Sequence, residues 1–223
     1  LCITLRFILA QKSAPYASQA TLALGEKWCI KEITVKCHQC NTDYYGPDIK
    51  DSTAYFVCLD CGHCYEVENY HGFTKEQIIE RIEKAFSGVV LGNGVGLWQA
   101  QAIDDYEAVS EQKRARLKDE KEQWSKLSGA ELQRCHSSLS FFDADGMRFH
   151  LPAFIIESIK GEVDDPLFHL SSLDEYGTSK FESMSLGHKK AVSEYLIWCL
   201  TKDEYTYEQH EIRKALQYFW EIT

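Results

Sequence analysis

The spacing of apolar residues along the chain changes near residue 73. Before this point, short β-prone runs lie between turn-forming residues, which predicts strands; these runs are residues 33–35, 54–57 and 65–67. After it, apolar residues recur every three or four positions, which predicts helices. We therefore expect three parts: a leader over residues 1–28 that is disordered or misassigned, a β-rich part over residues 29–72, and a mainly helical domain over residues 73–223.

Two capping boxes mark helix starts in the mainly helical domain. They pair Thr74 with Gln77 and Ser128 with Glu131. The first box precedes apolar residues at helical spacing, namely Ile78, Ile82 and Phe86, and the second precedes a short helix through Cys135. Further helices are expected over Leu97–Ala108, Ser110–Leu127, Ser185–Lys202 and Tyr207–Ile222.

A turn-like sequence interrupts this helical pattern. Apolar residues flank Asp143-Ala-Asp145-Gly146, which predicts a β-hairpin with a positive φ angle at Gly146. Pro152 is expected to end the second strand and to begin a helix through Ile159. Together with the strands before residue 73, this hairpin predicts an α+β fold class.

Composition and charge narrow the class of protein. Hydrophobic residues make up 44% of the 223 residues and charged residues 26%, as in an ordinary globular chain. No apolar run approaches the roughly 18 residues that a membrane-spanning helix requires, so we expect no membrane contact. The formal net charge of −10 repels the phosphates of nucleic acids and favours a basic partner.

Four of the nine cysteines have the spacing of a metal site. Cys37 and Cys40 form one Cys-x-x-Cys pair, and Cys58 and Cys61 form another. A tight turn within each pair points both sulfurs the same way, so two such turns can surround one tetrahedral Zn²⁺ ion. Gly62 follows the second pair, where the turn favours a positive φ angle.

Neighbouring side chains leave this ligand set open. Cys64 forms an alternative pair with Cys61, and His38 or His63 could replace a cysteine as a ligand. A disulfide framework would instead require an oxidising compartment, and the chain carries no convincing secretory signal. We therefore expect Zn²⁺ as the cofactor.

Residues 31–70 resemble a zinc ribbon with two cysteine knuckles. The resemblance implies that Cys37, Cys40, Cys58 and Cys61 hold a structural zinc with no open coordination position. Zinc ribbons often bind nucleic acid, but residues 1–72 carry eight acidic and six basic residues, which disfavours that partner. The expected architecture is thus a small N-terminal β zinc ribbon followed by a mainly helical domain with one β-hairpin.

Polar residues near the predicted hairpin allow a catalytic interpretation. Its members would be His136, Asp105 and His150, with Asp143 in the turn. In the alternative that we favour, Asp143 is a turn acceptor and the histidines satisfy buried polar groups. The glycine-rich stretch over residues 91–96 lacks the pattern of a phosphate-binding loop, so we expect an ordinary turn there.

Residues 91–181 resemble an uncharacterised bacterial family that is known only as a domain of unknown function. The segments NGVGLWQAQAIDDY, RCHSSLSFFDADGMRFHLPAFI and DPLFHL carry this resemblance. It implies a shared fold and a cytoplasmic location, and it brings no established activity.

Three functions follow from these patterns. We favour a zinc-binding protein-interaction module that neutralises or regulates a basic partner, because residues 73–223 carry 26 acidic and 18 basic residues. One alternative is a nucleic-acid-associated regulator that uses the zinc ribbon. The other is a hydrolase-type enzyme with its site near His136, Asp143 and His150.

Overall fold

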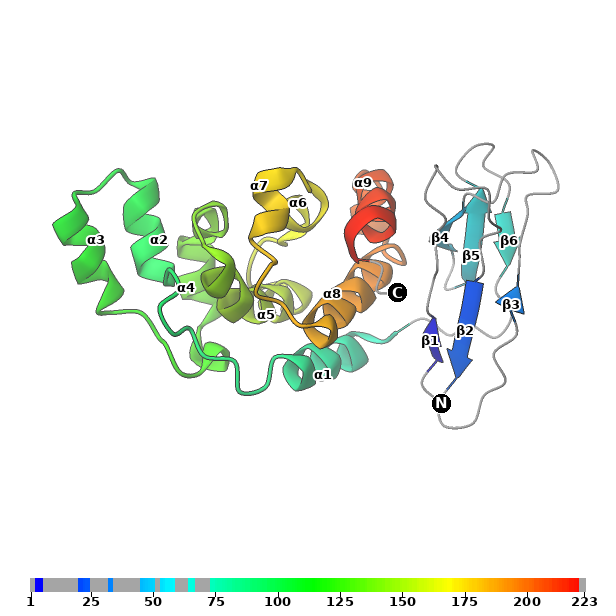
Figure 1. Ribbon diagram of the computed structural model, residues 1–223, viewed down its shortest axis with the longest axis horizontal. Coiled ribbons are helices and arrows are strands. Elements are labelled where there is room, and N and C mark those ends of the chain that lie inside the picture. The colour runs from blue at the N-terminus through cyan, green and yellow to red at the C-terminus, as the bar shows by residue number, and fades with distance from the viewer. Residues whose placement is uncertain are drawn as a thin grey trace. The chain divides into compact units, whose positions relative to one another are not determined.

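The computed structural model describes residues 73–220 together with their side chains, and before them the backbone of six short strands (Figure 1). Contacts between residues divide the chain into two units. One unit is Thr74–Tyr195, and the other combines Leu1–Phe73 with Leu196–Thr223.

The six strands form two antiparallel sheets. β1 (Ile3–Leu5), β2 (Ala20–Leu24) and β3 (Glu32–Ile33) are the first sheet, in that order. β4 (Tyr45–Lys50), β5 (Thr53–Cys58) and β6 (Cys64–Glu66) are the second. In the second sheet, Cys58 lies opposite Tyr45, and Cys64 lies opposite Val57.

The unit Thr74–Tyr195 is built around one long helix, α5 (Ala144–Lys160). α1 (Lys75–Ala85), α4 (Gly129–Arg134) and the 3-10 helix η1 (Trp124–Lys126) contact α5. α2 (Leu97–Asp104) packs against α3 (Val109–Arg116) and against the 3-10 helix η2 (His136–Ser140). The remaining helices are α6 (Leu167–Ser171), α7 (Glu175–Ser179) and the first part of α8 (Leu186–Cys199).

The core of this unit gathers on α5. Between Met147 and Ile156 every residue of α5 except Arg148 is buried, so this helix is covered on all sides. Each large apolar side chain buried in this way contributes about 1.5–3 kcal/mol to folding. The largest fully buried side chains of the unit include Phe86, Phe149, Phe154, Phe181, Ile78, Ile82 and Leu97.

Both predicted capping boxes are confirmed. Thr74 Oγ1 accepts a hydrogen bond from Gln77 N at 3.2 Å, and Thr74 N donates to Gln77 Oε1 at 2.9 Å. Ser128 and Glu131 make the equivalent pair of bonds at the start of α4. Each box satisfies backbone N–H groups that the first turn of a helix leaves without partners.

The predicted β-hairpin is wrong. Asp143 is instead the N-cap of α5, and its Oδ1 accepts a hydrogen bond from Gly146 N at 2.8 Å. Gly146 has no positive φ angle, and Pro152 lies inside α5 rather than at a strand end. Residues 73–220 contain no strand, so the α+β class with one β-hairpin is wrong for this domain, which is built from helices alone.

The segment forms a helix instead of a hairpin because α5 is buried. Proline inside a helix costs about 3 kcal/mol because it removes a backbone hydrogen bond and crowds the preceding turn. The many buried apolar residues of α5 outweigh that cost, and Pro152 is itself buried among them.

The described C-terminal part of the other unit is helical as well. After α8 come the 3-10 helix η3 (Asp203–Tyr205), α9 (Gln209–Ala215) and the π-helix η4 (Leu216–Trp220). The two predicted C-terminal helices are therefore confirmed in outline, with α8 and α9 shorter than expected. Among the described residues, no helix combines the length and apolar character needed to cross a membrane.

Candidate functional site

A depression on the surface of α7 combines acidic and aromatic side chains. It has a volume of about 560 Å³ and is lined by Asp174, Glu175, Tyr176 and Ser179. We call it the α7 depression. Asp174 caps α7, because its Oδ1 accepts a hydrogen bond from Gly177 N at 2.6 Å. The cap fixes the helix start, and Glu175 and Tyr176 follow directly on its exposed first turn.

Tyr176 is held in place from beneath. Its hydroxyl donates a hydrogen bond to Ser140 O at 3.0 Å, yet the residue is 63% exposed. Lys180 Nζ lies 4.7 Å from the centre of the Tyr176 ring, which is a cation–π distance. One end of this aromatic side chain is therefore anchored while much of its surface faces solvent.

Among the described residues, Lys180 forms no ion pair with the carboxylates around the depression. The residue is buried, and its Nζ donates to the backbone oxygens of Leu139 and Ser140 at 3.0 and 2.7 Å. Burial lowers the pKa of Lys180, whereas the charge of Asp174 raises it. Since the ammonium is turned toward carbonyl groups, it is not available to a ligand at the surface.

The surrounding stretch is strongly acidic. Residues 161–187 contain six acidic residues, and Lys180 is the one Lys or Arg among them. Five of the six are exposed, and within the described part of the chain none of these five has an ion-pair partner: Glu162, Asp164, Asp174, Glu175 and Glu182. Phe168 in the neighbouring α6 is 71% exposed and adds an apolar group to this surface.

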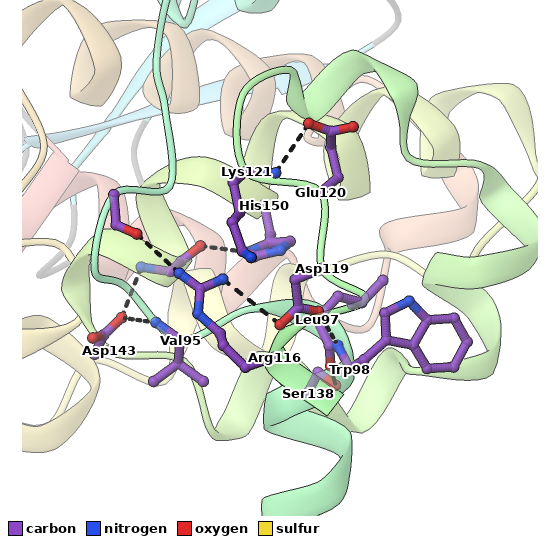
Figure 2. Close-up of polar contacts among 12 residues, drawn as sticks. Val95, Leu97, Trp98, Arg116, Asp119, Glu120, Lys121, Ser138, Asp143 and His150 are labelled. Carbon is purple, nitrogen blue, oxygen red and sulfur yellow. Dashed lines mark hydrogen bonds and ion pairs between the residues drawn. The ribbon is translucent and has the colours of Figure 1, made fainter. Parts of the chain in front are cut away.

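A second polar feature lies under the glycine-rich stretch Leu91–Gly96, with two side chains fully buried and a third, that of Arg116, 19% exposed. It consists of Arg116, Asp119 and His150, and we call it the buried triad (Figure 2). The side chain of Asp119 is fully buried, and its Oδ1 accepts a hydrogen bond from Trp98 N at 2.7 Å. Burial raises the pKa of Asp119, against the opposing effects of this hydrogen bond and of Arg116.

The other two members of the buried triad are anchored to backbone oxygens. Arg116 Nη2 donates to Gly92 O at 2.9 Å, and His150 Nδ1 donates to Gly146 O at 2.7 Å. His150 is stacked on Phe142, with ring centres 4.3 Å apart. Burial lowers the pKa of His150 to about 3, and the nearby charge of Arg116 acts in the same direction. His150 is thus neutral at physiological pH.

The glycine-rich stretch packs so closely that it cannot act as a phosphate loop. Asp143 Oδ1 accepts hydrogen bonds from Val95 N at 2.9 Å and from Gly146 N at 2.8 Å. The carboxylate of the protein itself therefore occupies the place at the N-terminus of α5 where an anion could bind. A Cβ at Gly94 would lie 2.6 Å from Gly146 N, which explains the glycine at that position.

The proposed catalytic members are not brought together by any described hydrogen bond or ion pair. His150 is fully buried between aromatic rings, so it cannot meet a substrate. His136 Nε2 approaches Asp164 O at 3.2 Å. Asp105 is exposed after α2, where its Oδ1 accepts a hydrogen bond from Gln101 Nε2 at 3.1 Å. Asp143 is occupied as a helix cap, and no described contact joins these residues into one site.

The predicted zinc ligands cannot be placed by their side chains. Cys37, Cys40 and Cys61, with the alternatives His38 and His63, lie outside the described residues, and Cys58 and Cys64 lie in strands of which only the backbone is described. Among the described residues no group of three or more His, Cys, Asp or Glu side chains could hold a metal ion. The zinc site therefore stays a prediction.

Sequence reasoning missed the α7 depression and two members of the buried triad. The charges of Arg116 and Asp119 are part of an alternating series that is typical of a solvated helix, and nothing local distinguishes these two. Closely spaced glycines were the available signal, since Gly94 and Gly96 permit close approach of other groups. For the depression, the run of unopposed acidic residues after residue 161 was the signal.

Comparison with known proteins finds a family to which the chain is similar. A family model described as a family of unknown function (DUF6714) matches residues 74–223. The expected resemblance to an uncharacterised domain is confirmed in that form, over more of the chain than residues 91–181. No curated protein and no solved structure matches the chain.

Proposed function

Since the chain belongs to the DUF6714 family, which brings no known activity, we propose from its geometry that the helical domain binds a basic segment of a partner protein at the α7 depression. The observation that carries this proposal is the combination, in one depression of about 560 Å³, of two carboxylates with an anchored and exposed aromatic ring. Carboxylates and aromatic faces both attract Lys and Arg side chains.

The magnitudes favour a partner with several basic residues. An exposed ion pair contributes about 0.2–1 kcal/mol, and an exposed cation–π contact about 0.5–1 kcal/mol. A single Lys or Arg in the depression would therefore bind weakly. Glu162, Asp164 and Glu182 extend the negative surface, so that a basic segment gains from several pairs at once.

The charge of the domain supports the same type of partner. With 26 acidic and 18 basic residues over positions 73–223, the domain attracts a basic protein over long range and repels nucleic-acid phosphates. Phe168 adds an exposed apolar group that a partner could cover. We propose that the protein regulates or neutralises its partner by this contact.

The test is a binding titration of a fluorescein-labelled oligolysine peptide with the full chain at low salt, in which fluorescence anisotropy reports the bound fraction. Tyr176→Ala should weaken binding roughly two- to fivefold, as expected for the loss of an exposed cation–π contact. Glu175→Gln should weaken it roughly two- to fivefold. The matched control is Glu122→Gln, which removes the same charge from an exposed position outside the stretch 161–187 and should leave binding within about twofold.

Two results would refute the proposal. One is the absence of oligolysine binding at low salt. The other is an equal loss of affinity in Glu175→Gln and Glu122→Gln, because that would mean the peptide responds only to net charge. Unchanged far-UV circular dichroism of each variant would show that the helices are intact.

We also propose that Cys37, Cys40, Cys58 and Cys61 bind a structural Zn²⁺ ion. The support is their spacing as two Cys-x-x-Cys pairs. Elemental analysis of the purified full chain should find zinc equimolar with protein. Cys40→Ser should lose this zinc, and Cys29→Ser, a cysteine outside both pairs, should keep it. Wild-type protein free of zinc, or a Cys40→Ser variant with full occupancy, would contradict the proposal.

A further inference from the structure

Three side-chain atoms of the buried triad have no hydrogen-bond partner among the described residues. They are Arg116 Nη1, Asp119 Oδ2 and His150 Nε2, all enclosed by protein. The other polar atom named above for each side chain is already bonded, to Gly92 O, Trp98 N and Gly146 O respectively. Each residue is thus fixed at one atom and leaves a second one unsatisfied in the same region of the interior (Figure 2).

Unsatisfied polar atoms of this kind are costly. A buried donor or acceptor without a partner costs about 1–3 kcal/mol, and more for charged groups. Native proteins avoid such costs with buried water, which typically makes about three hydrogen bonds to polar groups that lack other partners. Three unsatisfied atoms in one cluster match that number.

The three atoms also have donor and acceptor roles that one water molecule can satisfy. Because Gly146 O can only accept, His150 Nδ1 carries the proton, and neutral His150 therefore presents Nε2 as an acceptor. Asp119 Oδ2 is a second acceptor, and Arg116 Nη1 is a donor. A molecule bound by all three must donate two hydrogen bonds and accept one.

We propose that one water molecule is bound between Arg116 Nη1, Asp119 Oδ2 and His150 Nε2 as a fixed part of the fold. Arg116 Nη1 and Asp119 Oδ2 are 3.7 Å apart, which is too long for a direct hydrogen bond. One oxygen about 2.8 Å from each atom fits this separation. An anion would be repelled by Asp119 and a cation by Arg116, whereas neutral water suits both.

This water joins parts of the chain that are distant in sequence. Through Arg116 it is linked to the glycine-rich stretch, through Asp119 to the start of α2, and through His150 to α5. The close packing of the glycine-rich stretch against α5 and Asp119 would then depend on a solvent molecule as well as on direct contacts.

The decisive experiment is a crystal structure of the full chain at a resolution that shows ordered solvent. We expect a density peak of single-oxygen size within about 3.2 Å of all three atoms. Three results would overturn the proposal: direct hydrogen bonds among the triad, density for an ion or a larger molecule, or an empty space between the three atoms.

Nuclear magnetic resonance of the wild-type chain gives an independent test in solution. A long-lived water should transfer magnetisation to the ring protons of His150. His210, which has an exposed ring, is the matched control and should show no such transfer from a long-lived water. His150→Phe keeps an aromatic ring against Phe142 and removes Nε2, so the crystal peak should be lost in that variant. Equal signals from His150 and His210 would refute the proposal even if the variant does not fold.

Discussion

Replacing Gly96 by alanine tests the packing of the buried triad directly. Gly96 is the N-cap of α2 with φ −85° and ψ 171°, a backbone conformation that alanine adopts readily. The substitution therefore acts through steric overlap and not through backbone strain. A Cβ at this position would overlap the carboxylate of Asp119 and would lie 2.7 Å from the Cβ of Asp119. The clash is with a fully buried side chain that has little room to move.

Three contributions set the expected loss of stability. Forcing extra atoms into a packed interior costs about 1–3 kcal/mol. Displacement of Asp119 breaks its 2.7 Å hydrogen bond from Trp98 N, and bonds to charged groups contribute about 1.5–3 kcal/mol. Alanine is also a poorer N-cap than glycine, by up to about 1 kcal/mol. We expect Gly96→Ala to lower the free energy of unfolding by about 3 kcal/mol or more, out of a typical 5–15 kcal/mol.

Urea unfolding of the full chain, monitored by far-UV circular dichroism, measures this loss. The matched control is Gly187→Ala, since a Cβ at Gly187 in α8 would meet only Ser185 Oγ at an ordinary 3.6 Å. That variant should change stability by less than about 1 kcal/mol and could raise it, because alanine is the better helix former. If the free energies of unfolding of the two variants differ by less than about 1 kcal/mol, Asp119 is not held where we describe it.

Three further predictions concern single residues. Burial lowers the pKa of His150 to about 3 and that of His169 to about 4, from 6.5, so the unfolded chain binds these protons first. The contribution of these neutral histidines to the free energy of unfolding should be fully present above pH 6.5. For each histidine it should fall by about 1.4 kcal/mol per pH unit as the pH drops toward 4. His169→Gln should reduce this slope in acid titrations, and an unchanged slope would contradict the assignment. Cys135 is fully buried, and burial raises its pKa from 9.0 to about 11, so iodoacetamide should label it at least about 100-fold more slowly in the native than in the unfolded chain, as mapped by mass spectrometry; equal rates would show that the thiol is accessible. Tyr106 has φ 56° and is 94% exposed, so Tyr106→Gly should stabilise the protein by about 1 kcal/mol in urea unfolding, and a loss of stability would indicate contacts of the ring.

Features set by residues close in sequence could be predicted. The capping boxes at Thr74 and Ser128 depend on groups three residues apart, and both formed as expected. The burial of Ile78, Ile82 and Phe86 follows from the same local periodicity.

The buried triad could not be predicted, because its surroundings come from distant segments. Arg116 reaches Gly92, which is 24 residues away, and Asp119 reaches Trp98, which is 21 residues away. Each residue carries a charge that on its own favours solvent. Only contacts with these distant segments bury Asp119 fully and leave the Arg116 side chain 19% exposed, and no pattern within a helix predicts those contacts.

Asp143 shows why the hairpin prediction failed. Asp-Ala-Asp-Gly suits both a tight turn and a helix N-cap, since either places an acidic side chain next to free N–H groups. What distinguishes them is the segment that follows, Met147–Ile156, which is mostly apolar for longer than a typical strand. Once α5 forms, Asp143 accepts bonds from both Val95 N and Gly146 N. The residue that was taken for a turn acceptor therefore closes the helix N-terminus and, for the same reason, occupies the position that an anionic ligand of the glycine-rich stretch would need.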